Sequence, residues 1–268
     1  MLIRVGADGR LTQDGCTTHY SAPMKQIGSL AFWIFVGVTS LLFFPIALLL
    51  WVVTAPFGPR KVALHRFTCF WASLYIWINP VWRVHVHGRH NIEHGHTYVL
   101  VANHLSLLDI LIMFRLFRDF KWVSKVEVFK VPVIGWNMRL NGYIPLRRGD
   151  RESVVAMFAA CRRTIAAGSS VMIFPEGTRS LTGEMRPFKL GAFELAQETR
   201  VPIVPIVIKG THNALPKHGF LLQGRHNISL TALPAVPVAV VESMSAEELA
   251  AHVRTIIAAE LATPIQSS

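Results

Sequence analysis

Hydrophobic positions form one long continuous run near the start of the chain and short, interrupted runs after it. Residues 27–55 contain no charged side chain, whereas a helix that crosses a bilayer needs only about 20 apolar residues. The pattern therefore predicts a membrane segment. Because Pro45 lies inside it, a kinked helix or a hairpin that enters and returns fits as well as a straight span. A signal peptide is excluded, since the run is too long and starts too late.

A second apolar stretch, residues 62–82, is rich in aromatic side chains: Trp71, Tyr75, Trp77 and Trp82. Aromatic residues at this density are typical of the boundary between lipid headgroups and acyl chains, so we expect this stretch to lie there. The alternative is a helix buried in a protein core.

Beyond residue 82, short apolar runs of strand type alternate with runs of helical period. Strands are predicted at 82–87, 98–102, 120–124, 142–147, 170–174, 201–208 and 228–232. Helices are predicted near 106–117, 131–139, 151–167, 188–199 and 246–263, with Asp150 and Ser245 as N-caps of the third and the last. This alternation predicts an α/β fold, in which helices flank a mixed, mostly parallel sheet and an N-terminal helical segment anchors the protein in a membrane.

The net charge indicates the kind of binding partner, and the cysteine content indicates the redox state of the compartment. The formal net charge is +11 and the isoelectric point is near 10.1, which indicates a polyanionic partner such as a nucleic acid, anionic lipid headgroups or a phosphorylated substrate. The three cysteines are odd in number and far apart. They form neither a disulfide framework nor a zinc spacing, and they fit a reducing compartment.

The first candidate site follows the predicted strand at 98–102. There Asn103, His104 and Ser106 interrupt the apolar run, and Asp109 follows in the next helix. Positions five apart in one helix are about 140° apart, so His104 and Asp109 meet only if His104 lies in the turn. Asp109 would then fix the imidazole tautomer and leave the other nitrogen as a base. The alternative is that Ser106-x-x-Asp109 is only a capping box.

Two further polar clusters end predicted strands, and parallel strands would bring them to the same edge of the sheet. In the turn at 174–180, Pro175 and Gly177 stop the strand and present Glu176 and Arg179. Arginines at 147, 148 and 151 follow the strand at 142–147. Lys189 opens a later helix, whose free N-terminus also attracts anions. The alternatives are surface turns with solvated charges.

Other kinds of site have weaker support. His90-x-x-Glu93-His94 matches a zinc pattern, but Gly88 and Gly95 leave barely two helical turns, so we expect an incidental turn and no metal site. The dinucleotide, P-loop and serine-elbow patterns are absent. Nucleic-acid binding is disfavoured, because no known binding fold is visible and the chain carries an anchor.

The clusters, in this order, resemble those of the glycerolipid acyltransferase family, and within it the bacterial 1-acyl-sn-glycerol-3-phosphate acyltransferases. Asn103-His104-x4-Asp109 resembles the first motif of the family and Gly142-x-Ile144-x-x-Arg147 the second. Residues 174–180, Phe-Pro-Glu-Gly-Thr-Arg-Ser, resemble the third, and residues 201–205 the fourth. The likeness covers about residues 75–210, and the N-terminal apolar pair also fits.

The resemblance implies a reaction. His104 would take the proton from the free sn-2 hydroxyl of lysophosphatidic acid while this oxygen attacks an acyl thioester, and Asp109 would orient the ring, with no acyl-enzyme. The substrate-binding residues implied are Arg147, Glu176, Gly177, Thr178, Arg179 and Lys189. No metal or cofactor is implied, since acyl-CoA or an acyl carrier protein brings the acyl group as co-substrate.

The resemblance also sets expectations for the whole chain. We divide it into a mobile N-terminus (1–24), a membrane-anchoring region (25–81) and an acyltransferase domain (82–268). Basic residues after the first apolar run predict a cytoplasmic active site on the inner membrane. Leu105, Leu146 and Arg148 depart from the family pattern, so other lysophospholipids and lyso-ornithine lipids remain alternative acceptors. A non-catalytic lipid-binding module is the alternative function, and the sequence does not indicate an oligomeric state.

Overall fold

The computed structural model describes residues 22–58, 60–180, 182–215 and 220–265. Most of the segment predicted to be mobile, 1–24, lies outside the described residues, as does Cys16. Residues 22–24 begin the first helix. Cys69 and Cys161 are free and buried.

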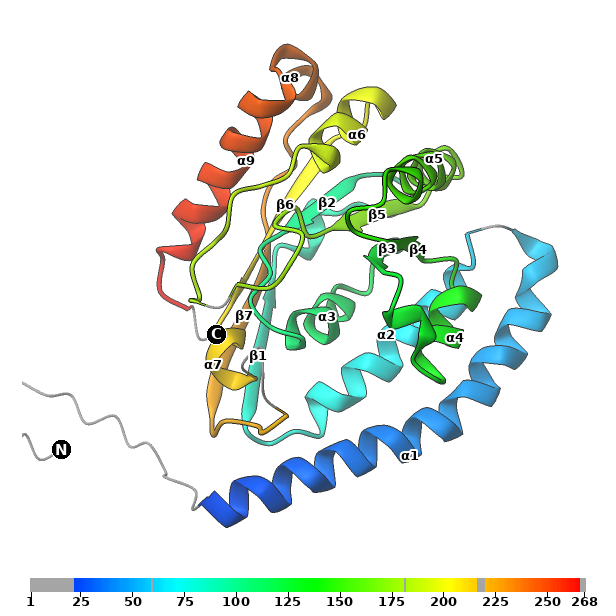
Figure 1. The fold of residues 1–268 in the computed structure, drawn as a ribbon, viewed down its shortest axis with the longest axis vertical. Helices are drawn as coiled ribbons and strands as arrows, with labels where there is room; N and C mark the ends of the chain where they lie inside the picture. Colours follow the sequence, from blue (N-terminus) through cyan, green and yellow to red (C-terminus); the bar gives the residue numbers. More distant parts are fainter. Residues whose placement is uncertain (1–21, 59, 181, 216–219, 266–268) are drawn as a thin grey trace, which may run out of the picture.

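The described chain forms a seven-stranded sheet with helices on both faces (Figure 1). The strand order is β1-β7-β6-β2-β5-β3-β4, and every neighbouring pair is parallel except β6 and β7. The predicted mixed, mostly parallel sheet is therefore confirmed. The strands are β1 (Trp82–His87), β2 (Val99–Ala102), β3 (Phe120–Lys125), β4 (Ile144–Leu146), β5 (Ser170–Ile173), β6 (Ile203–Lys209) and β7 (His226–Ala232).

The central strands β2 and β6 are buried along their whole length because helices cover both faces. One face packs against α2 (Val62–Trp77), α3 (Leu108–Met113) and α4 (Ile134–Leu140). The other packs against α5 (Arg151–Ala166), α6 (Gly191–Thr199), α8 (Val238–Ser243) and α9 (Ala246–Leu261). Single helical turns of 3-10 type lie at 55–57, 89–91, 114–116 and 128–130, and α7 (Thr211–Ala214) follows β6.

The first apolar run forms one continuous helix, α1 (Ala22–Thr54), with Pro45 inside it. The sequence left open a hairpin within residues 27–55, and the structure shows that this hairpin does not form. The chain turns back only after α1, and α2 packs along it (Figure 1). The described part of α1 is long and apolar enough to cross a membrane. Its outer side exposes Ile27, Leu30, Ile34, Val38, Leu41, Leu42, Leu49, Val52 and Val53.

The interpretation of residues 62–82 as a headgroup-facing stretch is wrong for most of its aromatic residues. Trp71 and Tyr75 are each only 5% exposed, because α2 lies between α1 and the sheet and packs on both sides. Trp82, at the start of β1, is also 5% exposed. Phe70 and Trp77 are the exceptions, at 43% and 49% exposed. The alternative, a buried core helix, describes α2 better.

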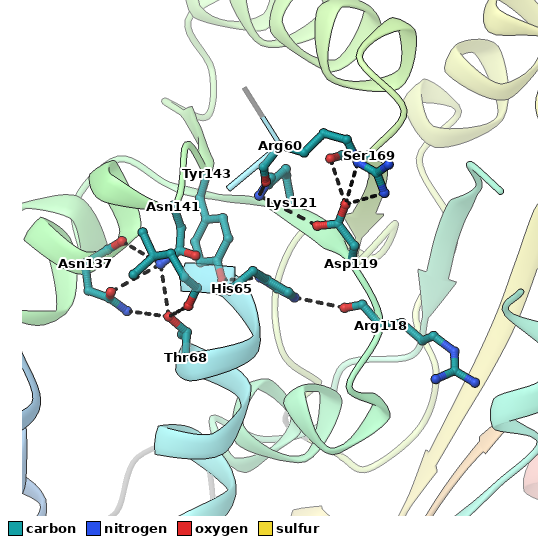
Figure 2. Close-up of polar contacts among 11 residues, drawn as sticks. Arg60, His65, Thr68, Arg118, Asp119, Lys121, Asn137, Asn141, Tyr143 and Ser169 are labelled. Carbon is teal, nitrogen blue, oxygen red and sulfur yellow. Dashed lines mark hydrogen bonds and ion pairs between the residues drawn. The ribbon is translucent and has the colours of Figure 1, made fainter. Parts of the chain in front are cut away.

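A buried polar cluster around Asp119 joins the start of α2 to the sheet (Figure 2). The Oδ2 atom of Asp119 accepts hydrogen bonds from Arg60 Nε and Nη2 at 3.2 and 3.1 Å and from Ser169 Oγ at 3.0 Å. Lys121, on β3, donates to the backbone oxygen of Arg60 at 2.6 Å. Burial is the main cause that lowers the pKa of Lys121 to about 8.

The same helix is fixed at a second point by His65, which is completely buried. Its Nε2 lies 2.9 Å from the backbone oxygen of Arg118, and its Nδ1 lies 3.0 Å from the hydroxyl of Tyr143 (Figure 2). A carbonyl only accepts, so Nε2 carries the proton and Nδ1 accepts from Tyr143. Burial lowers the pKa of His65 to about 3, so the ring stays neutral.

Candidate active site

Two loops meet at the carboxyl edge of the sheet, where β2 and β5 end. Because these strands are parallel neighbours, the turn after β2 and the turn after β5 lie side by side. The backbone nitrogen of Ser180 donates to the backbone oxygen of His104 at 3.0 Å. The two polar clusters that the sequence placed at strand ends are therefore in direct contact.

His104 and Asp109 form the predicted pair. Nδ1 of His104 lies 2.9 Å from Oδ2 of Asp109, and their side chains are 12% and 0% exposed. Since a carboxylate accepts, Nδ1 carries the proton and Nε2 is left with its lone pair. Among the described residues, Nε2 has no hydrogen-bond partner, so it is the ring atom available to a substrate.

Asp109 also holds the turn itself, as the capping alternative proposed. Its Oδ2 accepts from the backbone nitrogens of Leu105 and Ser106 at 2.7 and 2.8 Å. The geometry is not a full capping box, since Ser106 Oγ accepts from Leu108 and not from Asp109. One carboxylate thus fixes both the backbone of the turn and the tautomer of the imidazole, and the two interpretations hold together.

Glu176 is buried and its two oxygens brace the site. Oε1 accepts from the backbone nitrogen of His104 at 2.7 Å, and Oε2 accepts from that of Arg186 at 2.9 Å. Burial raises the pKa of Glu176, and these two hydrogen bonds oppose the rise. Both oxygens accept from the backbone, so Glu176 holds the turn in this structure. The substrate contact that the resemblance implied stays a prediction.

Gly177 and Lys189 lie against each other. The backbone of Gly177 has a φ of +68°, and a Cβ there would come within 3.0 Å of Lys189 Cε and 3.2 Å of Nζ. The ammonium therefore lies over the turn, and the backbone nitrogen of Lys189 donates to Pro175 at 2.9 Å. This arrangement brings one exposed cation to the loop that carries Thr178 and Arg179, both of which are half-buried.

Arg147 lies farther from the pair. It follows β4, which is separated from β2 by β3 and β5, or roughly 14 Å at the usual strand spacing. Its side chain is 64% exposed and lies 3.7 Å from Asp150. The structure thus places Arg147 at the predicted edge but not in contact with His104.

Sequence reasoning missed the residue that covers the imidazole. The ring of Phe174 stacks on that of His104 with centroids 3.9 Å apart and planes 8° apart. Trp122 lies behind Phe174, at 5.4 Å. The only signal was the proximity of Phe174 to the polar turn, and an aromatic residue at a strand end is ordinarily read as core.

Two polar side chains attach the turn after β2, residues 103–106, to the rest of the edge. Asn103, which is fully buried, donates to the backbone oxygen of Ile208 and accepts from its nitrogen, both at 2.9 Å. Ser106 Oγ donates to the backbone oxygen of Leu215 at 2.6 Å. The turn is therefore fixed to β6 and to the segment after α7.

The histidine-rich turn does not form the alternative zinc site. His90, Glu93 and His94 are exposed, and only residues 89–91 form a single 3-10 turn. Glu93 instead lies 2.9 Å from His96. Over the described ranges, no group of three or more histidine, cysteine, aspartate or glutamate side chains is arranged to hold a metal ion.

The chain resembles known proteins in both sequence and structure. Residues 83–209 match the family model described as Acyltransferase. A chloroplastic 1-acyl-sn-glycerol-3-phosphate acyltransferase of Brassica napus is 40% identical over 59% of this chain and 45% of its own length. A chloroplastic 1-acyl-sn-glycerol-3-phosphate acyltransferase of Arabidopsis thaliana is 34% identical over 80% of this chain and 60% of its own length. The chain thus spans about half the length of these relatives.

The fold has a counterpart among solved structures. The crystal structure of the 1-acyl-sn-glycerophosphate acyltransferase PlsC from Thermotoga maritima superposes with a TM-score of 0.72, over 89% of this chain and 96% of that one. The sequences are 22% identical over this match. The two chains therefore share the fold over most of their lengths.

Proposed function

We propose that this chain, whose residues 83–209 match the Acyltransferase family model, transfers a fatty acyl group from an acyl thioester to the sn-2 hydroxyl of lysophosphatidic acid. The product would be phosphatidic acid. The observation that carries the proposal is the buried pair of His104 and Asp109, at 2.9 Å, with Nε2 left unpartnered. The names of the relatives support the choice of acceptor.

In the proposed reaction, Nε2 of His104 accepts the proton of the hydroxyl while the oxygen attacks the thioester carbonyl. The new C–O bond forms and the C–S bond breaks. The departing thiolate then receives the proton from the imidazolium, which restores the neutral ring. General-base help of this kind contributes about 10²–10⁴ in rate.

Asp109 has two tasks in this scheme. It holds the imidazole in the tautomer with a free Nε2, and its negative charge stabilises the imidazolium when the proton arrives. The carboxylate accepts three hydrogen bonds at one oxygen, so its position is fixed before the substrate binds.

The acceptor phosphate requires cations near this pair, and Lys189 is the best placed of them. Its ammonium lies over Gly177, in the turn that contacts the backbone of His104. Arg179 belongs to the same turn, and Thr178 supplies a hydroxyl. We assign Arg147 to the outer rim, where it would meet the headgroup of a bound lipid. A guanidinium and an ammonium both suit a phosphomonoester.

We further propose that α1 inserts into a membrane and that the catalytic edge works at the surface of the bilayer on the cytoplasmic side. Support comes from the exposed apolar side of α1 and from the cations that follow it, Arg60, Lys61 and Arg66. A lysolipid could then reach His104 with its chain still in the lipid phase.

The test is an acyl-transfer assay of the full chain in detergent micelles, with a panel of lysolipids and with both acyl-CoA and acyl carrier protein as donors. We expect His104→Ala to lower kcat by about 10²–10⁴, while the protein still folds and unfolds in one cooperative thermal transition. His90→Ala, which alters an exposed ring, serves as the matched control.

Other results would replace the proposal. Consumption of thioester only with another lysolipid would change the acceptor. Lysolipid binding without any thioester consumption would favour the non-catalytic module. Full activity in His104→Ala would remove the proposed base.

A further inference from the structure

We propose that Phe174 is a positioning residue for His104: its stacked ring fixes the orientation of the imidazole and stabilises the cation that forms when the imidazole takes up a proton. The inference rests on the proposed function, since it concerns the base of that reaction. It adds a residue whose side chain is apolar and does not contact either substrate in the scheme above.

The geometry is that of a close, parallel stack. Ring centroids 3.9 Å apart with planes 8° apart leave no room for water between His104 and Phe174. Isolated aromatic pairs more often adopt offset or edge-to-face arrangements, and the other ring contacts of Phe174 and Trp122 are tilted or edge-on. A parallel contact this short therefore points to a ring that is held in place.

Phe174 is itself held in place by a neighbouring ring and by the turn that follows it. Trp122, which is 4% exposed, supports its ring from the sheet. Pro175 and Glu176 follow it directly, and Glu176 accepts from the backbone nitrogen of His104. The stack and the hydrogen bond of Glu176 thus connect the same two loops, the first between two side chains and the second from a side chain to the backbone.

The stack affects two properties of the imidazole. With Nδ1 bound to Asp109, the remaining freedom of His104 is rotation about its side-chain bonds, and a flat partner against one face blocks it. The face of an aromatic ring is also negative, so a cation over it is attracted by roughly 0.5–2 kcal/mol, which is about 2- to 30-fold in rate. The neutral ring gains less than the imidazolium, so the contact favours the transition state.

The experiment compares Phe174→Leu and Phe174→Tyr with the parent chain in micelles. We expect Phe174→Leu to lower kcat by about 10-fold, with the KM values for lysolipid and thioester within about 2-fold. Phe174→Tyr keeps the stack and should restore kcat. Phe158→Leu makes the same change at another half-buried phenylalanine, on α5, and should leave kcat as in the parent.

A second measurement does not depend on activity. A proton over the face of an aromatic ring resonates upfield, so the imidazole carbon-bound protons of His104 should move downfield in Phe174→Leu and stay in place in Phe174→Tyr. His104→Gln identifies the signal among the 12 histidines. A purely structural role for Phe174 would lower Tm without this pattern.

The outcomes separate the two proposals. If the parent transfers acyl groups and Phe174→Leu keeps its kcat, the role of Phe174 is excluded and the proposed function stands. If the parent shows no transfer, the proposed function fails, and the imidazole signals still decide whether the stack exists. An unchanged spectrum in Phe174→Leu overturns the inference in either case.

Discussion

At the scale of single residues, the proposed site depends on carboxylates that accept from the backbone. Asp109 and Glu176 together accept from four backbone nitrogens in and around the turn after β2, those of His104, Leu105, Ser106 and Arg186. Charged acceptors make stronger hydrogen bonds than neutral ones. The imidazole is therefore placed by two carboxylates, neither of which takes up a proton in the proposed reaction.

Glu176→Gln tests the bracing role. A side-chain amide has only one acceptor oxygen, so one of the two backbone nitrogens loses its partner, at a cost of about 1–3 kcal/mol. Since the turn then shifts, we expect kcat to fall by about 10- to 100-fold, with little change in the KM for lysophosphatidic acid. Steady-state kinetics at saturating thioester measures both quantities.

The matched control is Glu184→Gln, at an exposed position of the same loop, which should behave as the parent. A raised KM with an unchanged kcat would contradict the brace and would return Glu176 to the acceptor site.

His104 and Asp109 could be predicted from sequence because strand, turn and helix follow one another within a few residues, and the pairing is local. The stack of Phe174 and the brace of Glu176 could not be predicted. Each contact joins segments about 70 residues apart in the sequence. Neither an apolar ring nor a single glutamate indicates from the sequence which distant residue it will contact.

At the scale of elements, α2 is the helix whose surroundings the sequence pattern predicted wrongly. Its aromatic residues suggested contact with lipid, but its polar residues decide its position. His65 bonds to the backbone of Arg118, just before β3. Thr68 accepts from two asparagines of α4 and its C-terminal cap, Asn137 and Asn141 (Figure 2). A hydrophobic stretch that carries buried hydrogen-bonding groups must be packed against protein.

The neutral state of His65 predicts acid sensitivity. Its folded pKa is about 3 against 6.5 in the unfolded chain, so between these values the unfolded state binds a proton that the folded state does not. The free energy of unfolding therefore falls as the pH drops below 6.5, by about 3 kcal/mol at pH 4.5 from this group. Urea unfolding at pH 7 and pH 4.5 measures the loss.

His65→Gln keeps one donor and one acceptor but does not titrate, so it should lose about 3 kcal/mol less than the parent over this interval. His90→Gln, at an exposed position, should lose as much as the parent. Equal losses in His65→Gln and the parent would contradict a neutral, buried imidazole.

Most strands were predicted to within a few residues, because runs of apolar β-branched residues are a local signal. The short helices α7 and α8 were missed, since neither is long enough to show a helical period. The direction of β7, antiparallel to β6 and parallel to β1, could not be predicted either. Strand direction depends on how connections cross the sheet, which periodicity does not encode.

At the scale of the whole molecule, the apolar outer side of α1 lies opposite α9, across the sheet (Figure 1). An exposed apolar surface as long as α1 is unusual in a soluble monomer and marks a surface that a membrane or another protein covers. In the proposed function this surface is covered by the bilayer from which the lysolipid comes.

Leu42→Glu tests this surface. The side chain is 63% exposed on α1, so the change leaves the protein core intact while it removes about 1.5–3 kcal/mol of favourable lipid contact. We expect partitioning onto phosphatidylcholine vesicles to fall by at least about 10-fold, with an unchanged Tm. Co-sedimentation with the vesicles measures it.

Val155→Glu makes a matching change on α5, where the side chain is 60% exposed, and should bind vesicles as the parent does. Equal losses in the two variants would mean that net charge, and not the side of α1, controls binding.

The side chain of Asn103 takes the place of a backbone peptide group where the main chain leaves the sheet at the end of β2. Its amide acts as a substitute peptide group: it continues the ladder to β6 for one more step after the backbone has turned away. Aspartate lacks the donor, leucine lacks both groups, and glutamine is one methylene too long. The position of the His104 imidazole beside the sheet thus depends on the Asn103 carboxamide, which completes the hydrogen bonding to β6 where the main chain leaves the sheet.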